Sequence, residues 1–334
     1  MKLFFVVGTG RCGTQMLRNV LNTWENVVIL PETHFIVTLY DKYELKKINC
    51  NDFLEVVTNI YGASGVKWID VIINSSKRNI ENYKKDFEGY IINKNISGNI
   101  RNFVEAFYEF LYGEDLIFGD KTPHYGTNLS IINKIWPEAK IIHLIRDGVD
   151  SAHSMLGHQG FAKYINGQVK PKDLDRVMYK GKQVGCPDYK PTMSQALRFW
   201  ENVILVTQNE LKCIKDQNKL EVKYEDIVFF PGQEISKIAT FLEIDDNKKL
   251  LNRAISIPRP FPENRQVKKF GKEEYDDYLL QIKETMKLYN YPYHFNADRG
   301  LAGILREWYR GRYYYLLLLK KNIIKFIKII IGKV

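Results

Sequence analysis

Cysteine is scarce in this 334-residue chain, and the cysteines that occur stand far apart. They are Cys12, Cys50, Cys186 and Cys213, and no two of them form a Cys-x-x-Cys pair. Small disulfide-stabilised domains and zinc-binding modules need closely spaced cysteines, so this spacing excludes both classes. The fold must instead rest on a hydrophobic core, for which 45% hydrophobic residues are sufficient.

The sequence also lacks a signal peptide and an uninterrupted apolar run of spanning length. Met1 leads directly into apolar residues 3–7, which predicts that the protein stays in the cytoplasm. Residues 303–334 hold eight Lys/Arg and one acid, so they carry +7 of the net charge of +10. The remaining net charge of +3 on residues 1–302 does not indicate a nucleic-acid surface.

Basic and apolar residues mix in the C-terminal tail, residues 301–334. Lysines interrupt residues 313–334 too often for a spanning helix, but this mixture suits an anionic membrane surface. We therefore expect peripheral binding at the inner membrane face, or else a terminal helix that packs on the domain or on a partner subunit. The sequence does not indicate the oligomeric state.

The glycine-rich stretch near the N-terminus lacks the lysine of the ATP-binding loop. Residues 3–7 (LFFVV) predict a buried strand, residues 8–14 (GTGRCGT) a turn, and residues 15–21 a helix with one apolar face. ATP-binding loops have the form G-x-x-x-x-G-K-[ST], whereas Thr14 and Gln15 occupy the last two positions here and the cation is Arg11. The stretch predicts a phosphate site without a sign of Mg-ATP; a tight turn in another α/β domain is the alternative.

Strands alternate with helices along the rest of the chain. Apolar runs predict further strands at residues 27–30, 116–119, 140–145 and 220–224. Helical patterns occupy residues 45–112, a helical insertion, and residues 194–212 and 235–242. Residues 155–193, long and poorly periodic, predict a substrate lid. The alternation predicts an α/β fold over residues 1–300, with a mainly parallel central sheet flanked by helices in three layers.

Charged residues follow several of the predicted strands. Glu32 comes after residues 27–30, Lys121 after 116–119, and Arg146 directly after 140–145. The carboxyl ends of parallel strands share one edge of a sheet, where ligands of α/β proteins bind. We therefore expect these side chains to lie near the glycine-rich loop.

These motifs, in this order, resemble those of sulfotransferases that use 3′-phosphoadenosine-5′-phosphosulfate (PAPS). The resemblance extends over residues 2–292 and is nearest to the glycosaminoglycan and tyrosylprotein branch and its bacterial relatives. The segments that carry it are residues 8–14, the E-x-H-F of residues 32–35, the D-K-T-P of residues 120–123, Arg146 with Ser154, the Y-E-D of residues 224–226, and the basic residues 266–270 before a helix at 273–288. The resemblance implies a P-loop-type fold.

The resemblance implies a role for each matching residue. The loop around the 5′-phosphosulfate would comprise Gly10, Arg11, Cys12, Gly13, Thr14 and Gln15. The 3′-phosphate and adenine would contact Arg146, Ser154 and Tyr224, with Lys268 and Lys269 closing over the donor. Catalysis would use Arg11, Lys121 and Glu32 as the base, with His34 assisting or replacing it as the base. No metal is expected, because the sulfonate is already activated.

The implied reaction transfers a sulfonate from PAPS to a hydroxyl acceptor and releases 3′,5′-ADP. A carbohydrate or glycolipid is the expected acceptor, although another small molecule is open. Two alternatives remain at this stage. One is a nucleotide kinase or NTPase with an atypical phosphate loop, and the other is a non-catalytic, membrane-associated binding protein of the same fold.

Overall fold

The computed structural model describes residues 2–62, 65–76, 82–181, 190–244, 248–259 and 270–291. At its centre is a five-stranded sheet in the order β2-β3-β1-β4-β5, in which all neighbouring strands run parallel. The strands are β1 Lys2–Gly8, β2 Val27–Leu30, β3 Ile117–Asp120, β4 Lys140–Ile145 and β5 Lys219–Lys223. The predicted α/β fold with a parallel central sheet is therefore confirmed.

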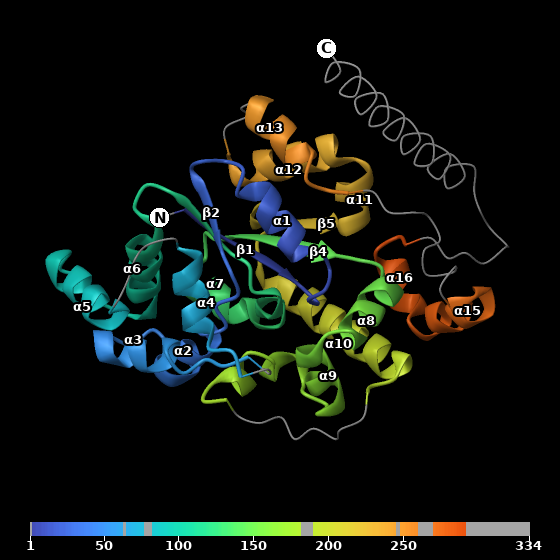
Figure 1. Cartoon of the computed structure of the whole chain (residues 1–334), viewed down its shortest axis with the longest axis horizontal. Coiled ribbons are helices and arrows are strands. Elements are labelled where there is room, and N and C mark those ends of the chain that lie inside the picture. The colour runs from blue at the N-terminus through green and yellow to red at the C-terminus, as the bar shows by residue number, and fades with distance from the viewer. Residues whose placement is uncertain are drawn as a thin grey trace, which may run out of the picture.

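Helices fill the connections between the strands and cover the sheet (Figure 1). They are α1 Thr14–Leu21, α2 Ile36–Tyr43, α3 Cys50–Val57, α4 Trp68–Ser75, α5 Tyr83–Asn93, α6 Ile100–Tyr112, α7 Leu129–Ile135, α8 Gly148–Leu156, α9 Gln159–Asn166, α10 Met193–Glu210, α11 Tyr224–Phe229, α12 Pro231–Leu242, α13 Lys248–Ile255, α15 Lys272–Gln281 and α16 Lys283–Leu288. Short 3-10 turns are η1 Pro123–Asn128, η2 Pro171–Asp173, η3 Arg176–Met178, η4 Leu211–Cys213 and η5 Asp216–Asn218.

The alternating side chains of β1 enter two separate cores. Phe4 and Val6 pack with apolar residues of α1, α12 and α13, whereas Phe5 and Val7 join the larger core that α7, α8 and α10 help to form. Successive side chains of a strand point to opposite faces, so an apolar run without alternation is buried on both. Figure 1 shows α1, α12 and α13 on one side of the sheet and α7, α8 and α10 on the other, which gives three layers.

Two stretches differ from the sequence-based expectation. Residues 155–193, predicted from their poor periodicity to be a substrate lid, contain helix α9 and the turns η2 and η3 in their described part, and their role as a lid remains a prediction. The expected helix at residues 273–288 is broken into α15 and α16 at Ile282, which is buried. A Cβ on Gly148 would lie 2.4 Å from Cδ1 of Ile282 and 2.9 Å from the Trp200 ring. The break thus places Ile282 in a space that a glycine leaves open.

Several predictions fall outside the described residues. These are the roles of Lys268 and Lys269, the boundary at residue 300 and the membrane contact of the tail, all of which remain predictions. Among the described residues, no helix is long and apolar enough to cross a membrane.

A buried carboxylate joins the ends of β2 and β3. Asp120 accepts hydrogen bonds from Tyr108 Oη at 2.6 Å and from the hydroxyls of Thr33 and Thr122, each at 2.7 Å. Burial raises the pKa of Asp120 to about 6, although the hydroxyl donors oppose this shift. Thr33 follows Glu32 and Thr122 follows Lys121, so the network fixes the two segments that carry predicted site residues.

Replacing Tyr108 with phenylalanine should lower the free energy of unfolding by about 1–3 kcal/mol, because the buried carboxyl group of Asp120 then loses a donor. Urea unfolding measures the change. The control Tyr40→Phe removes the hydroxyl of a half-buried tyrosine whose ring faces Lys134, and should change stability by less than about 0.5 kcal/mol. Equal losses in the two variants would contradict the role of the Asp120 network.

Candidate functional site

Five polar or glycine-rich segments follow the five strands at one edge of the sheet. In the order of the strands across the sheet they are Glu32 after β2, Lys121 after β3, the loop of residues 9–13 after β1, Arg146 after β4, and Tyr224 after β5. This edge is where α/β proteins bind ligands. The strand order places a carboxylate and a lysine on one side of the loop and an arginine and a tyrosine on the other.

The loop of residues 9–13 has the backbone of an anion site. Gly10, Arg11 and Gly13 have φ values of 73°, 54° and 99°, and α1 begins at the next residue. Residues with positive φ turn successive N–H groups toward one point, and the positive end of the helix dipole reinforces the attraction for an anion. The Tyr224 ring packs against Gly13, so closely that a Cβ there would lie 2.3 Å from its Cδ2.

Arg146 contacts this loop and keeps one N–H group without an acceptor among the described residues. Its Nη1 donates to the carbonyl oxygen of Arg11 at 3.0 Å, and its Nη2 donates to Asp150 at 2.9 Å. Its Cζ lies 4.8 Å from the centre of the Tyr224 ring. The Nε atom is buried and has no hydrogen-bond partner among the described residues. A buried donor without an acceptor is costly, so the group fits an anionic ligand.

Arg11 reaches toward Ser154, the last residue of the segment predicted to hold the 3′-phosphate. Its Nε donates to Ser154 Oγ on α8 at 3.2 Å, and Arg11 itself is exposed. Hydrogen bonds thus link the two arginines, the serine and the loop into one polar group. It can hold a ligand with more than one phosphate group.

Glu32 lies at the other end of the row between two cationic partners. Its Oε1 accepts from Lys121 Nζ at 2.7 Å, and its Oε2 contacts His34 Nε2 at 3.0 Å. Burial by itself would raise the pKa of Glu32, but Lys121 and His34 hold that pKa well below its usual range. The Glu32 side chain is 27% exposed, against 7% for Lys121 and 0% for His34. Glu32 is therefore the member of this trio that solvent and ligands reach most readily.

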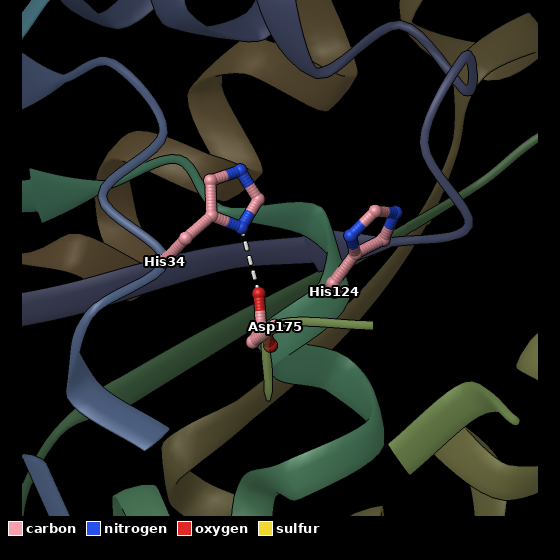
Figure 2. Close-up of side chains that lie close together, drawn as sticks. All are labelled: His34, His124 and Asp175. Atoms are coloured by element: carbon pink, nitrogen blue, oxygen red, sulfur yellow. Dashed lines mark hydrogen bonds and ion pairs between the residues drawn. The ribbon is translucent and has the colours of Figure 1, made fainter. Parts of the chain in front are cut away.

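A second carboxylate lies behind His34. Nδ1 of His34 contacts Oδ1 of Asp175 at 2.7 Å (Figure 2). Both side chains are fully buried. Burial by itself would lower the pKa of His34, but the hydrogen bonds to Asp175 and Glu32 raise it to about 9. At neutral pH His34 is accordingly an imidazolium that donates from both ring nitrogens.

His124 lies beside this pair and behaves differently. Its ring centre is 5.8 Å from that of His34, and neither of its ring nitrogens has a hydrogen-bond partner among the described residues. Burial lowers the pKa of His124 to about 4, so this ring is neutral at pH 7.

Together, the nearby ligand atoms of His34, His124 and Asp175 lie within 4.8 Å of one another, close enough to consider a metal ion. A metal needs a deprotonated nitrogen. Here Nδ1 of His34 instead makes a 2.7 Å hydrogen bond to Asp175. The geometry therefore fits a hydrogen-bonded network better than a metal centre.

The structure brings most of the sequence-predicted residues to this edge, from Glu32, His34 and Lys121 through the loop to Arg146, Ser154 and Tyr224. Sequence reasoning assigned no role to His124 or Asp175. His124 follows Lys121 closely after a predicted strand, which was a usable signal. Asp175 lies 141 residues from His34 in a stretch without a motif, so no sequence signal was available for it.

A sequence profile described as "Sulfotransferase family" matches residues 4–248. Among solved structures, the chain is similar to a sulfotransferase domain from the curacin biosynthetic pathway, with 16% identity over 95% of this chain and 97% of that chain and a TM-score of 0.46. It is also similar to a sulfotransferase from Alicyclobacillus acidocaldarius (15% identity, 87% and 97% of the chains, TM-score 0.45) and to mouse sulfotransferase SULT7A1 complexed with PAP (12%, 92% and 89%, 0.43). No curated protein matches the chain.

Replacing Gly13 with alanine should destabilise the protein more than replacing Gly65. Both residues have left-handed φ values, 99° and 82°, so both changes cost about 1–2 kcal/mol. Only the new Cβ at position 13 meets Tyr224, which should add about 1–3 kcal/mol, whereas Gly65 has nothing within 4 Å of such an atom. Urea unfolding compares the two, and equal losses would disprove the close packing of Tyr224 on the loop.

Proposed function

The chain belongs to the sulfotransferase family, and we propose that it transfers a sulfonate group from PAPS to a hydroxyl group of an acceptor. The observation that carries this proposal is the row of side chains at the sheet edge. An anion-binding loop lies between Arg146 on one side and the Lys121–Glu32 ion pair on the other. Such an arrangement suits a phosphate-bearing donor beside a hydroxyl-bearing acceptor.

The donor end would bind the two phosphate positions of PAPS. The N–H groups of residues 10–15 and the Arg11 side chain would hold the 5′-phosphosulfate, because the loop has three positive φ values directly before the N-terminus of α1. Arg146 and Ser154 would hold the 3′-phosphate, and the buried Nε of Arg146 supports this assignment. Tyr224 packs beside Gly13 and Arg146, which is compatible with a contact to the adenine. Lys268 and Lys269 remain predicted to close over the donor.

The bound donor supplies an already activated sulfonate. In the transfer, the acceptor oxygen forms a bond to sulfur while the bond from sulfur to the bridging phosphate oxygen breaks, and its electron pair stays on 3′,5′-ADP. Glu32 would take the hydroxyl proton. Arg11 and the loop N–H groups would stabilise the charge that develops on the departing phosphate. The strand order places Lys121 between Glu32 and the loop, where its ammonium group suits the sulfonate.

Glu32 suits the role of base better than His34. Its side chain is partly exposed, whereas His34 is fully buried with both ring nitrogens engaged. The depressed pKa of Glu32 ensures that the carboxylate is ionised but makes it a weak proton acceptor while both cationic partners contact it. Movement of Lys121 toward the sulfonate would remove one of these partners and strengthen the base.

The acceptor is proposed to be a carbohydrate or glycolipid, because the E-x-H-F segment at residues 32–35 resembles the corresponding segment of sulfotransferases of the glycosaminoglycan branch. Another hydroxyl-bearing small molecule is the alternative acceptor. The competing reading as a nucleotide kinase or NTPase is disfavoured because Thr14 and Gln15 replace the lysine and the Mg²⁺-binding hydroxyl of an ATP loop.

Isothermal calorimetry with 3′,5′-ADP, Mg-ATP and 5′-AMP tests the donor assignment without an acceptor. We expect 3′,5′-ADP to bind most tightly, because only it offers phosphates to both the loop and Arg146. Arg146→Ala should weaken this binding by about 10-fold or more, given about 1.5–3 kcal/mol for a hydrogen bond to a charged group. Ser154→Ala should have a smaller effect, and the exposed Arg198 on α10 provides the control Arg198→Ala.

A preference for Mg-ATP would favour the kinase hypothesis, and binding without transfer to any acceptor would favour a non-catalytic protein.

Replacing Glu32 with glutamine should lower kcat about 10²–10⁴-fold, the usual contribution of a general base, while leaving 3′,5′-ADP binding nearly unchanged. The assay follows 3′,5′-ADP release from PAPS with a panel of sugars, glycolipids and simple alcohols. Glu284→Gln, at an exposed side chain of α16, is the control and should retain full activity. Unchanged turnover in Glu32→Gln would assign the base to another residue, with His34 the first candidate.

A further inference from the structure

A chain of contacts runs from Asp175 to His34, from His34 to Glu32, and from Glu32 to Lys121. We propose that Asp175 is a positioning residue which, through His34, holds the carboxylate of Glu32 at the acceptor side of the site. The contacts are 2.7 Å from Asp175 to His34, 3.0 Å from His34 to Glu32, and 2.7 Å from Glu32 to Lys121. This inference rests on the proposed role of Glu32 as the base.

Asp175 is itself held firmly. It is fully buried and lies between η2 and η3, whose backbone is tied to η1 by hydrogen bonds from Thr127 Oγ1 to the Pro171 carbonyl at 2.8 Å and from Asn128 Nδ2 to the Lys172 carbonyl at 3.2 Å. The next residue, Arg176, makes a two-point ion pair with Asp41 on α2, at 2.6 and 2.9 Å. The segment that carries Asp175 is therefore anchored on both sides, and its Oδ1 contacts Nδ1 of His34 at 2.7 Å.

His34 adopts a backbone conformation that it has to be held in. Its φ is 58°, in the left-handed region that non-glycine residues rarely occupy. Its ring lies 4.9 Å from the Trp68 ring, centre to centre, and is hydrogen-bonded at both nitrogens. Such conformations cluster at functional sites, where surrounding contacts compensate for their cost. The ring orientation is thus over-determined, as a support for Glu32 requires.

The charges around His34 explain why a carboxylate is needed behind it. Glu32 and Asp175 contact the ring directly, and Asp120 at the end of β3 interacts with it electrostatically. The neutral His124 lies beside it on η1, as Figure 2 shows. The ammonium group of Lys121 lies on the far side of Glu32. With Asp175 ionised, the imidazolium donates Nδ1–H to Asp175 and Nε2–H to Glu32. Without that charge, the pKa of His34 would fall, the ring would lose its positive charge at a lower pH, and its hydrogen bond to Glu32 would weaken.

Histidine NMR on the full-length protein tests the proposal without an acceptor. Uniform ¹⁵N labelling of histidine, with His34→Gln to assign the signal, should show both ring nitrogens of His34 protonated at pH 8 and a titration midpoint near the pKa of about 9. This raised pKa stabilises the folded protein below about pH 6.5, and the contribution is lost as pH rises through about 9. Asp175→Asn should move the midpoint down toward about 6.5.

Asp173→Asn is the matched control, because it removes a partly exposed carboxylate from the same segment. It should leave the His34 signal unchanged. Both variants should bind 3′,5′-ADP as the wild type does, since the donor end is untouched. A neutral His34 at pH 8 in the wild type would overturn the proposal even if Asp175→Asn failed to fold, and so would an unchanged midpoint in a folded Asp175→Asn.

Kinetics with an acceptor from the panel supply the second readout. Asp175→Asn should lower kcat by about 10–10²-fold, the cost of a misplaced catalytic group, with an unchanged KM for PAPS. Its activity should also decline at lower pH than that of the wild type, in which His34 keeps its proton to about pH 9. A fall in activity with an unshifted pH profile would indicate a merely structural role. A wild-type protein that does not bind 3′,5′-ADP would instead refute the proposed function.

Discussion

The site depends first on the buried hydrogen-bond network of Asp120, which joins the segments after two neighbouring strands. Thr33 and Thr122 both donate to this carboxylate, and they adjoin Glu32 and Lys121 in the sequence. A buried charge without donors would be prohibitively costly, so the three hydroxyl donors are what permit Asp120 at this position. The network therefore fixes the distance at which the ion pair of the site forms.

Strand order then separates two kinds of chemistry along one edge. The central strand β1 carries the anion loop, β4 and β5 carry Arg146 and Tyr224, and β3 and β2 carry Lys121 and Glu32. Under the proposed function, a phosphate-rich donor and a hydroxyl acceptor would meet at the loop and contact largely different residues. Lys121, between the two halves, is the side chain that both reactants would reach.

Much of this could be predicted from local sequence. The LFFVV run of β1 has no polar residue, so a strand buried on both faces was the natural interpretation, and the charged residues after later strands indicated a shared edge. Helix α9 and the break at Ile282 could not be predicted, because both depend on what their side chains meet. Ile282 packs where Gly148, distant in the sequence, has no Cβ, next to the Trp200 ring.

The sequence by itself determined the parallel α/β fold and the family, since strand periodicity, glycine spacing and strand-end residues are local signals. Tertiary structure alone decided the charge states of the groups around His34. His34 and Asp175 are 141 residues apart and meet in a site from which water is excluded. Only there do a hydrogen bond at 2.7 Å and a second carboxylate outweigh the burial cost of an imidazolium. Charge states of buried groups follow from such encounters, which no local pattern encodes.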